Sequence, residues 1–278
     1  MKRKNNLIIL TIFCMLVSCS PRGGNMEKIS TRTLDSVSQV EWNTLSEKKI
    51  FFGHQSVGFN IIDGIKDVIQ KNNRISLEIV ETDDPADFNR PIFGHARAGE
   101  NTKPNTKCDD FKKMLQSGIG DSVDIAFLKF CYVDMSQKFD EQEVFDYYKR
   151  TLSQLQALYP HLKFVHLTLP LKSNQAGLKG WVKSLIGSPL GNSVDNICRN
   201  RFNDLMRGEY EGQAPLFDLA LYESTLPNGR RQVFVHQDTT YFSMAPQYTN
   251  DGGHLNESGR VWIAEQLLIF LTKLDEKG

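Results

Sequence analysis

The sequence has few cysteines, and their number and spacing argue against a small disulfide-rich domain and against a zinc-binding domain. Its 278 residues include five cysteines, and three of them follow residue 19: Cys108, Cys131 and Cys198. Three cysteines allow at most one disulfide, which is too few for a disulfide-stapled scaffold. The spacing matches no zinc motif, so we expect no metal and no organic cofactor.

An excess of charge of either sign is also missing. Lys and Arg together number 33, and Asp and Glu together also number 33. No basic surface is implied, which argues against nucleic acid as a partner. The length suits one large α/β domain with a sizeable core. Nothing in the sequence indicates the oligomeric state.

The chain opens with a basic segment followed by a short apolar one. "MKRKNN" precedes "LIILTIFCMLV", which is too short to span a bilayer and is typical of a secretory signal. "LVSC" at 16–19 resembles the bacterial lipobox, in which the cysteine becomes the lipidated N-terminus. We expect a signal peptide at 1–18, a lipidated tether at 19–40 and a domain at 41–278, anchored to a cell-envelope membrane through Cys19. The alternative is an ordinary signal peptide cut nearby.

From residue 49 onward, apolar strands alternate with amphipathic helices. The strands are expected at 49–53, 76–81, 124–130, 163–170 and 215–221, and the main helices at 57–72, 109–118, 141–160, 194–210 and 257–274. This alternation predicts a three-layer α/β/α sandwich around a five-stranded, mainly parallel, flavodoxin-like sheet. The segments 82–108, 171–193 and 222–256 read as long loops, and 177–191 could form a lid or contact a membrane.

Ser56 follows the first strand at the entry to the first long helix. In "FFGHQSVG" it could be a helix cap, which stabilises a helix by about 1 kcal/mol. It could also be a nucleophile, because a helix N-terminus offers N–H groups to a developing oxyanion. His54, two residues earlier, would then share its face.

The segment "NDGGHLNESG" at 250–259 offers a base. Two glycines between Asp251 and His254 would let the loop fold so that the carboxylate reaches the imidazole Nδ1. That contact would leave Nε2 facing a nucleophile. A tight turn before the last helix explains the same residues without catalysis.

Taken together, these segments resemble the SGNH (GDSL-type) hydrolase superfamily, and the likeness spans about 49–274. "IFFGHQSVG" resembles the first block, "ARAGENT" at 96–102 the second, and "DIAFLKFCYVD" at 124–134 occupies the place of the third. "LFDLA" at 216–220 resembles the last strand, and Asp251 and His254 match the family's Asp-x-x-His. The resemblance implies a Ser56–His254–Asp251 triad, with the N–H groups of Ser56 and Gly99 forming the oxyanion hole.

The third block departs from the family pattern. The family's oxyanion asparagine is replaced by Val133, and losing one such donor typically costs on the order of 10²–10³ in rate. Substitute donors or substrate contacts are expected among a few nearby residues: Lys129, His54, Tyr132, Asn101 and Arg97. The lysine has an alternative explanation, a structural ion pair with Asp134.

The resemblance implies a serine esterase that removes acyl groups, such as acetyl, from a carbohydrate or a similar envelope ester. A catalytically weak glycan-binding lipoprotein of the same fold is the alternative, and the missing asparagine motivates it.

Overall fold

The structure, a computed structural model, describes residues 32–174 and 191–274. In this part of the chain, six parallel strands form one sheet in the order β2–β3–β1–β4–β5–β6. The strands are β1 (Ile50–His54), β2 (Ile79–Glu81), β3 (Phe93–Arg97), β4 (Ile125–Leu128), β5 (Lys163–Leu167) and β6 (Leu216–Phe217). The central strands are buried on both faces, which explains their nearly continuous apolar sequences.

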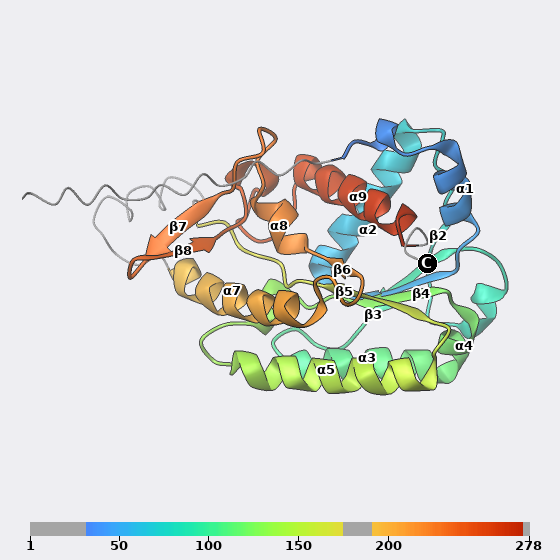
Figure 1. Cartoon of the computed structure of the whole chain (residues 1–278), viewed down its shortest axis with the longest axis horizontal. Helices are drawn as coiled ribbons and strands as arrows, with labels where there is room; N and C mark the ends of the chain where they lie inside the picture. The colour runs from blue at the N-terminus through green and yellow to red at the C-terminus, as the bar shows by residue number, and fades with distance from the viewer. Residues whose placement is uncertain (1–31, 175–190, 275–278) are drawn as a thin grey trace, which may run out of the picture.

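Helices cover both faces of the sheet (Figure 1). One layer contains α1 (Gln39–Ser46), α2 (Ser56–Lys71), α8 (Leu219–Ser224) and α9 (Glu257–Thr272). The other contains α3 (Pro104–Met114), α5 (Glu141–Leu158) and α7 (Gly191–Tyr210). The predicted three-layer α/β/α architecture is confirmed. In the described ranges, no helix has the length and hydropathy needed to cross a bilayer.

The sheet has one strand more than the five expected. β3 lies inside the segment 82–108 that the sequence assigned to a loop, and it pairs directly with β1. β1 therefore lies between β3 and β4, and the chain builds the sheet outward from it in both directions. In such sheets the ligand crevice lies at the carboxyl ends of the strands where the order reverses. This places the crevice at the end of β1.

The segments expected as loops contain further short elements. The hairpin β7 (Val233–His236) and β8 (Thr239–Phe242) turns at Gln237 and Asp238, which both have positive φ. Short helical turns are also present: η1 (Leu34–Ser36), η2 (Pro85–Asn89), the π-helical η3 (Leu115–Ile119), α4 (Gly120–Ser122), η4 (Tyr132–Asp134) and η5 (Pro246–Tyr248).

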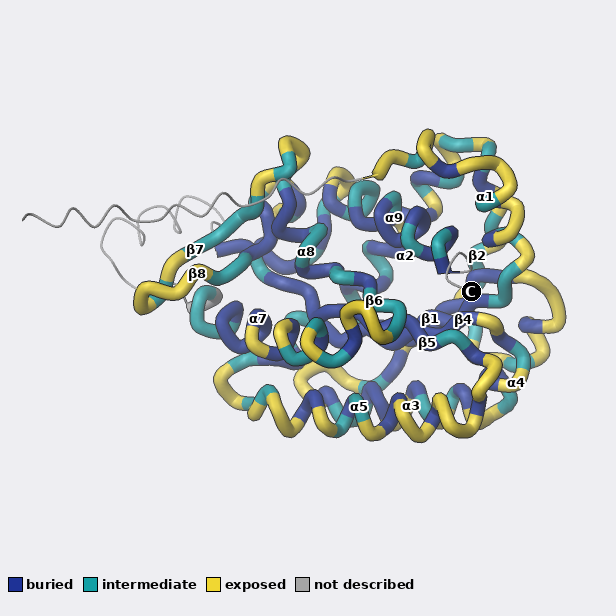
Figure 2. The backbone as a smooth tube through the Cα atoms, viewed as in Figure 1, coloured by how far each residue is buried: buried dark blue, intermediate teal, exposed yellow. Residues whose placement is uncertain are grey.

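Figure 2 shows that the central strands of the sheet are buried, whereas the outer faces of the helices are exposed. The buried core extends further toward the N-terminus than the sequence predicted, because Val37 is 1% exposed. The packed domain thus includes residues that were assigned to the tether. The signal peptide and Cys19 lie outside the described residues, as does nearly all of the proposed lid at 177–191.

Candidate active site

Ser56 is the first residue of α2 and stands at the carboxyl end of β1. The N-cap of this helix is Gln55, and no side chain caps it, so the interpretation of Ser56 as a helix cap is wrong. In the described residues, no hydrogen bond engages the Ser56 N–H. The Ser56 Oγ lies 3.8 Å from Cys131 Sγ, and a thiol is a weak hydrogen-bond partner. Both groups of Ser56 thus remain available to a ligand.

The residue before Ser56 fixes the direction of the Ser56 N–H. The Gln55 carbonyl accepts from Gly58 N–H at 2.7 Å and from His54 Nδ1 at 3.0 Å. In a trans peptide the N–H points opposite to the carbonyl, so the Ser56 N–H faces away from His54. The Gln55 side chain donates to the Gly99 carbonyl at 2.6 Å, which ties the first block to the second.

His54 forms a buried pair with His95. His54 Nε2 and His95 Nδ1 are 3.1 Å apart. Because His54 Nδ1 must donate to the Gln55 carbonyl, His54 Nε2 accepts the proton of His95 Nδ1. Burial lowers the pKa of His54 to about 3 and that of His95 to about 4, so both are neutral at pH 7. Both nitrogens of His54 are engaged, and its geometry is that of a positioning residue.

Asp251 and His254 adopt the expected contact. His254 Nδ1 lies 2.7 Å from Asp251 Oδ2, and Asp251 Oδ1 accepts from the N–H groups of Gly253 and His254 at 2.8 Å each. Burial alone would raise the pKa of Asp251, but these hydrogen bonds outweigh it and hold the pKa below its usual value. The aspartate is therefore ionised, and it holds the imidazole with Nε2 free.

One short turn brings the serine and the histidine together. Cys131 contacts the Ser56 hydroxyl, and the next residue, Tyr132, packs edge-on against the His254 ring with centroids 5.6 Å apart. Gly253 permits this packing, because a Cβ there would lie 2.8 Å from the Tyr132 ring. No hydrogen bond joins Ser56 directly to His254 among the described residues. The two side chains thus flank the same turn without a hydrogen bond between them.

Gly99 has the backbone that its predicted role needs, but its N–H is already bonded. Its φ is +60° and a Cβ would lie 2.4 Å from Lys107 N, so only glycine fits. Its N–H donates to Asp110 Oδ2 at 2.9 Å. The oxyanion role of Gly99 stays a prediction, and it requires this N–H to leave Asp110.

The expected Lys129–Asp134 pair is wrong. Asp134 pairs instead with Lys107, with 2.5 Å between Nζ and Oδ2 and both side chains fully buried. The carboxylate also accepts from the N–H groups of Cys131 and Thr102, so it joins the second and third blocks. Sequence analysis missed Lys107, because a lysine in "NTKCDDF" looks like a surface residue.

The residues expected to replace the missing asparagine differ in whether their polar groups already have partners. Lys129 is fully buried, with its Nζ donating to the Phe130 carbonyl and lying 3.7 Å from Cys131 Sγ; burial lowers its pKa. Asn101 is bound by Lys107, and the Arg97 guanidinium lies 4.5 Å from the centre of the Phe59 ring. The Tyr132 hydroxyl makes no hydrogen bond within the described ranges, and burial raises its pKa.

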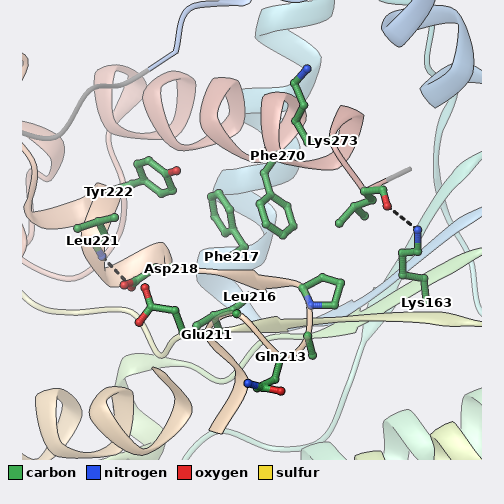
Figure 3. Close-up of a pocket in the computed structure, with 14 residues that line it drawn as sticks. Lys163, Glu211, Gln213, Leu216, Phe217, Asp218, Leu221, Tyr222, Phe270 and Lys273 are labelled. Carbon is green, nitrogen blue, oxygen red and sulfur yellow. Dashed lines mark hydrogen bonds between the residues drawn. The ribbon is translucent and has the colours of Figure 1, made fainter. Parts of the chain in front are cut away.

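A cavity of about 650 Å³ lies between β6, α8 and α9 (Figure 3). The rings of Phe217, Tyr222 and Phe270 line it, and Lys163, at the start of β5, donates to the Leu274 carbonyl beside it. It adjoins the beginnings of β5 and β6, whereas Ser56 follows the end of β1, so it is separate from the candidate site. Within residues 32–174 and 191–274, no group of three or more His, Cys, Asp or Glu residues could hold a metal ion.

Comparisons with known proteins gave structural likenesses alone. No family model matches the sequence, and no curated protein matches it. A Streptococcus pneumonia protein described as a candidate platelet activating factor is 15% identical, with a TM-score of 0.49, and the match covers 84% of this chain and 90% of that one. An Enterococcus faecalis lipase/acylhydrolase is 12% identical, with a TM-score of 0.46 and coverages of 81% and 95%.

A third similar structure is described as a candidate lipolytic protein of the G-D-S-L family from Desulfitobacterium hafniense. It is 7% identical, with a TM-score of 0.45, and the match covers 80% of this chain and 99% of that one.

Proposed function

We propose that the protein is a serine ester hydrolase of the SGNH type with Ser56 as nucleophile, His254 as base and Asp251 as the group that orients the base. The observation that carries this proposal is the turn at Cys131 and Tyr132, which contacts Ser56 on one side and His254 on the other. A serine nucleophile needs a hydroxyl that is available for attack and a base that a third group orients. The weak contact with the Cys131 thiol leaves the Ser56 hydroxyl available. The hydrogen bond to Asp251 orients His254.

The reaction follows from these roles. Ser56 Oγ attacks the ester carbonyl while His254 Nε2 takes its proton, and Asp251 stabilises the resulting imidazolium. His254 then returns the proton to the leaving alcohol. Water, activated by the same histidine, releases the acyl group from Ser56. For the proton transfer, the loop that carries His254 has to bring Nε2 within about 3 Å of the serine hydroxyl.

The oxyanion needs at least two donors. Ser56 N–H is one, since no described residue accepts a hydrogen bond from it and it lies at the N-terminus of a long helix. Gly99 N–H is the second once it leaves Asp110. The Tyr132 hydroxyl, which has no hydrogen-bond partner among the described residues, is our candidate to replace the side-chain donor that Val133 lacks. Lys129 and Asn101 are already bonded to other groups.

The substrate and the location extend the same proposal. A lipid-anchored chain at a cell-envelope membrane, attached through Cys19, would meet acylated carbohydrates. The resemblance noted in the sequence favours removal of acyl groups, acetyl among them, from such a glycan.

A second function is motivated by one observation. Gly99 N–H donates to Asp110, and Val133 has no side-chain donor. The proposed oxyanion hole is therefore incomplete in this structure. A lipoprotein that binds the glycan and hydrolyses it slowly would need no complete hole.

A serine-reactive probe distinguishes the two functions. A fluorophosphonate should label the wild-type protein, and Ser56→Ala should abolish labelling. Hydrolysis of p-nitrophenyl acetate should fall by roughly 10⁴-fold or more in Ser56→Ala and in His254→Ala. The exposed Ser117 on η3 provides the matched control, because Ser117→Ala should retain both labelling and hydrolysis.

Folded wild-type protein that neither reacts with the probe nor hydrolyses the ester would exclude the esterase and favour the binding function. Circular dichroism of each variant shows whether the fold is retained.

A further inference from the structure

A second cavity, of about 640 Å³, opens beside the turn that joins Ser56 to His254. Tyr132 lines this cavity with one part of its surface and packs against His254 with another. Its lining combines apolar surface from Val133 and Phe139 with polar and charged groups, among them Thr102, Ser136, Lys172, Asp195 and Arg199. Through Tyr132, the cavity therefore lies close to His254.

Arg199 places a buried cation at this cavity. Its side chain is 3% exposed. Its Nε donates to the Tyr132 carbonyl at 2.7 Å and its Nη1 to Asn196 Oδ1 at 2.8 Å. The nearest carboxylate oxygen belongs to Asp195 and is 3.9 Å from Nη2, which is too long for a hydrogen bond. A guanidinium has five donors, so some of these donors have no hydrogen-bond partner among the described residues, although Asp195 is an ion-pair partner.

Lys172 adds a second cation. Its Nζ lies 5.2 Å from the centre of the Tyr132 ring, and within the described ranges its ammonium makes no ion pair and no hydrogen bond. Burial lowers the pKa of Lys172, and the nearby Arg199 lowers it further. The two cations thus repel one another across the same tyrosine.

The charges around the cavity do not cancel. Lys172, Arg199 and the exposed Lys138 line the cavity together with one carboxylate, that of Asp195. Outside the lining, Asp251 attracts Lys172 and Glu223 lies near Arg199. Burial raises the pKa of Glu223 to about 8, so that side chain is mostly neutral at pH 7 and three cations face two carboxylates. Burial lowers the pKa of Arg199 to about 10, so it is still charged at neutral pH. A partly buried cation without a matched anion is costly, and a bound anion would remove that cost.

We propose that this cavity binds a carboxylate on the alcohol portion of the substrate, so that the enzyme acts on acyl esters of acidic sugars, such as acylated uronic-acid glycans. This inference rests on the proposed function for the position of the alcohol beside His254. The planar guanidinium of Arg199 matches the two oxygens of a carboxylate, and Lys172 supplies the second contact.

The first experiment measures binding without catalysis. In the Ser56→Ala protein, 4-hydroxybenzoate and 4-hydroxybenzamide are titrated by ligand-observed NMR, because they have nearly the same size and differ in charge. The anion should bind about tenfold more tightly, as a charge-assisted hydrogen bond predicts. Adding Lys172→Met should abolish this preference, and adding Lys172→Arg should retain it.

The matched control is Lys71→Met, which removes an exposed lysine at the far end of α2, about 22 Å along the helix from Ser56. It should leave the preference for the anion unchanged. Equal affinity for the two compounds, or an equal loss of preference in Lys71→Met, would overturn the inference.

The second experiment measures turnover of the corresponding acetyl esters, 4-acetoxybenzoate and 4-acetoxybenzamide. Lys172→Met should lower kcat/KM about tenfold for the anionic ester and leave it within about twofold for the neutral one. If both esters respond equally, the anion site is refuted while the esterase stands. If neither ester is hydrolysed but the anion still binds selectively, the esterase fails and the anion site stands.

Discussion

The backbone N–H of Gly99 donates to the carboxylate of Asp110, with 2.9 Å between the nitrogen and Oδ2. The same N–H is the one that an SGNH-type mechanism would direct at the oxyanion. Under the proposed mechanism, Asp110 would compete with the substrate for this donor, and mutation of Asp110 would remove the competition.

Asp110→Ala should raise kcat for p-nitrophenyl acetate. A hydrogen bond worth about 1 kcal/mol no longer has to break, which corresponds to a rate increase of about fivefold. The control is the neighbouring Asp109→Ala, since Asp109 bonds to the Tyr147 hydroxyl on the surface and should not affect the rate. A lower kcat in Asp110→Ala would show that the carboxylate supports the site by holding the loop.

Lys107→Met should destabilise the protein strongly. The substitution leaves the Asp134 carboxylate buried without its cation, and breaking a buried pair in this way typically costs about 3–5 kcal/mol. Urea unfolding gives the free energy of unfolding. The double variant Lys107→Met with Asp134→Asn should recover part of the loss, because no uncompensated charge is left. A loss below about 1 kcal/mol in the single variant would contradict the pairing.

The stability of the protein should fall as the pH drops from about 6.5 toward 4. Burial lowers the pKa of His54 to about 3 and that of His166 to about 4, from an ordinary value of 6.5. Below pH 6.5 these two histidines bind protons in the unfolded chain but stay neutral in the folded chain. The free energy of unfolding therefore decreases as the pH falls. Each histidine accounts for about 2 kcal/mol between pH 6.5 and pH 5.

Urea unfolding at several pH values tests this sign and slope. His54→Gln and His166→Gln should each flatten the pH dependence, and the double variant should flatten it further, because the two histidines lie on different strands. A slope that is unchanged in both single variants would refute the assignment to these residues.

Gly58→Ala should destabilise the protein and reduce hydrolysis together. A Cβ at this position would lie 2.2 Å from His54 Cγ, and the ring cannot move without breaking its bonds to Gln55 and His95. Overpacking of this kind costs about 1–3 kcal/mol. At Gly208, on α7, an added Cβ would have no neighbouring atom within 4 Å. Because alanine favours the helical conformation more than glycine does, Gly208→Ala should stabilise the protein by about 0.5–1 kcal/mol. Thermal unfolding and ester hydrolysis of both variants check the contrast.

The layered fold could be predicted from sequence because most strands are buried apolar runs between amphipathic helices. β3 could not, since its five residues, "FGHAR", include a glycine, a histidine and an arginine and carry no strand-like pattern. The strand expected at 215–221 was too long. β6 ends at Phe217, because the Asp218 side chain accepts from Leu221 N–H and begins α8.

Within the site, the Asp251–His254 contact was predictable because it is local, with two flexible glycines between the partners. The Lys107–Asp134 and His54–His95 contacts join segments that are 27 and 41 residues apart. Neither pair has a sequence signal, because each depends on the position of β3 beside β1 and on how α3 returns to the sheet. The same holds for Arg199, whose cationic group reaches the turn at Tyr132 from α7.

Ser56 opens α2, and His254 precedes α9 by three residues. These two helices pack closely where Gly64 meets the Arg260 carbonyl, and Arg260 Nε is bonded to Asp67 Oδ2 at 2.8 Å. The proposed nucleophile and the proposed base are thus attached to one pair of closely packed helices and not to independent lobes. Heat inactivation of such an enzyme would coincide with the melting of its helices, with no earlier stage at which the folded protein is inert.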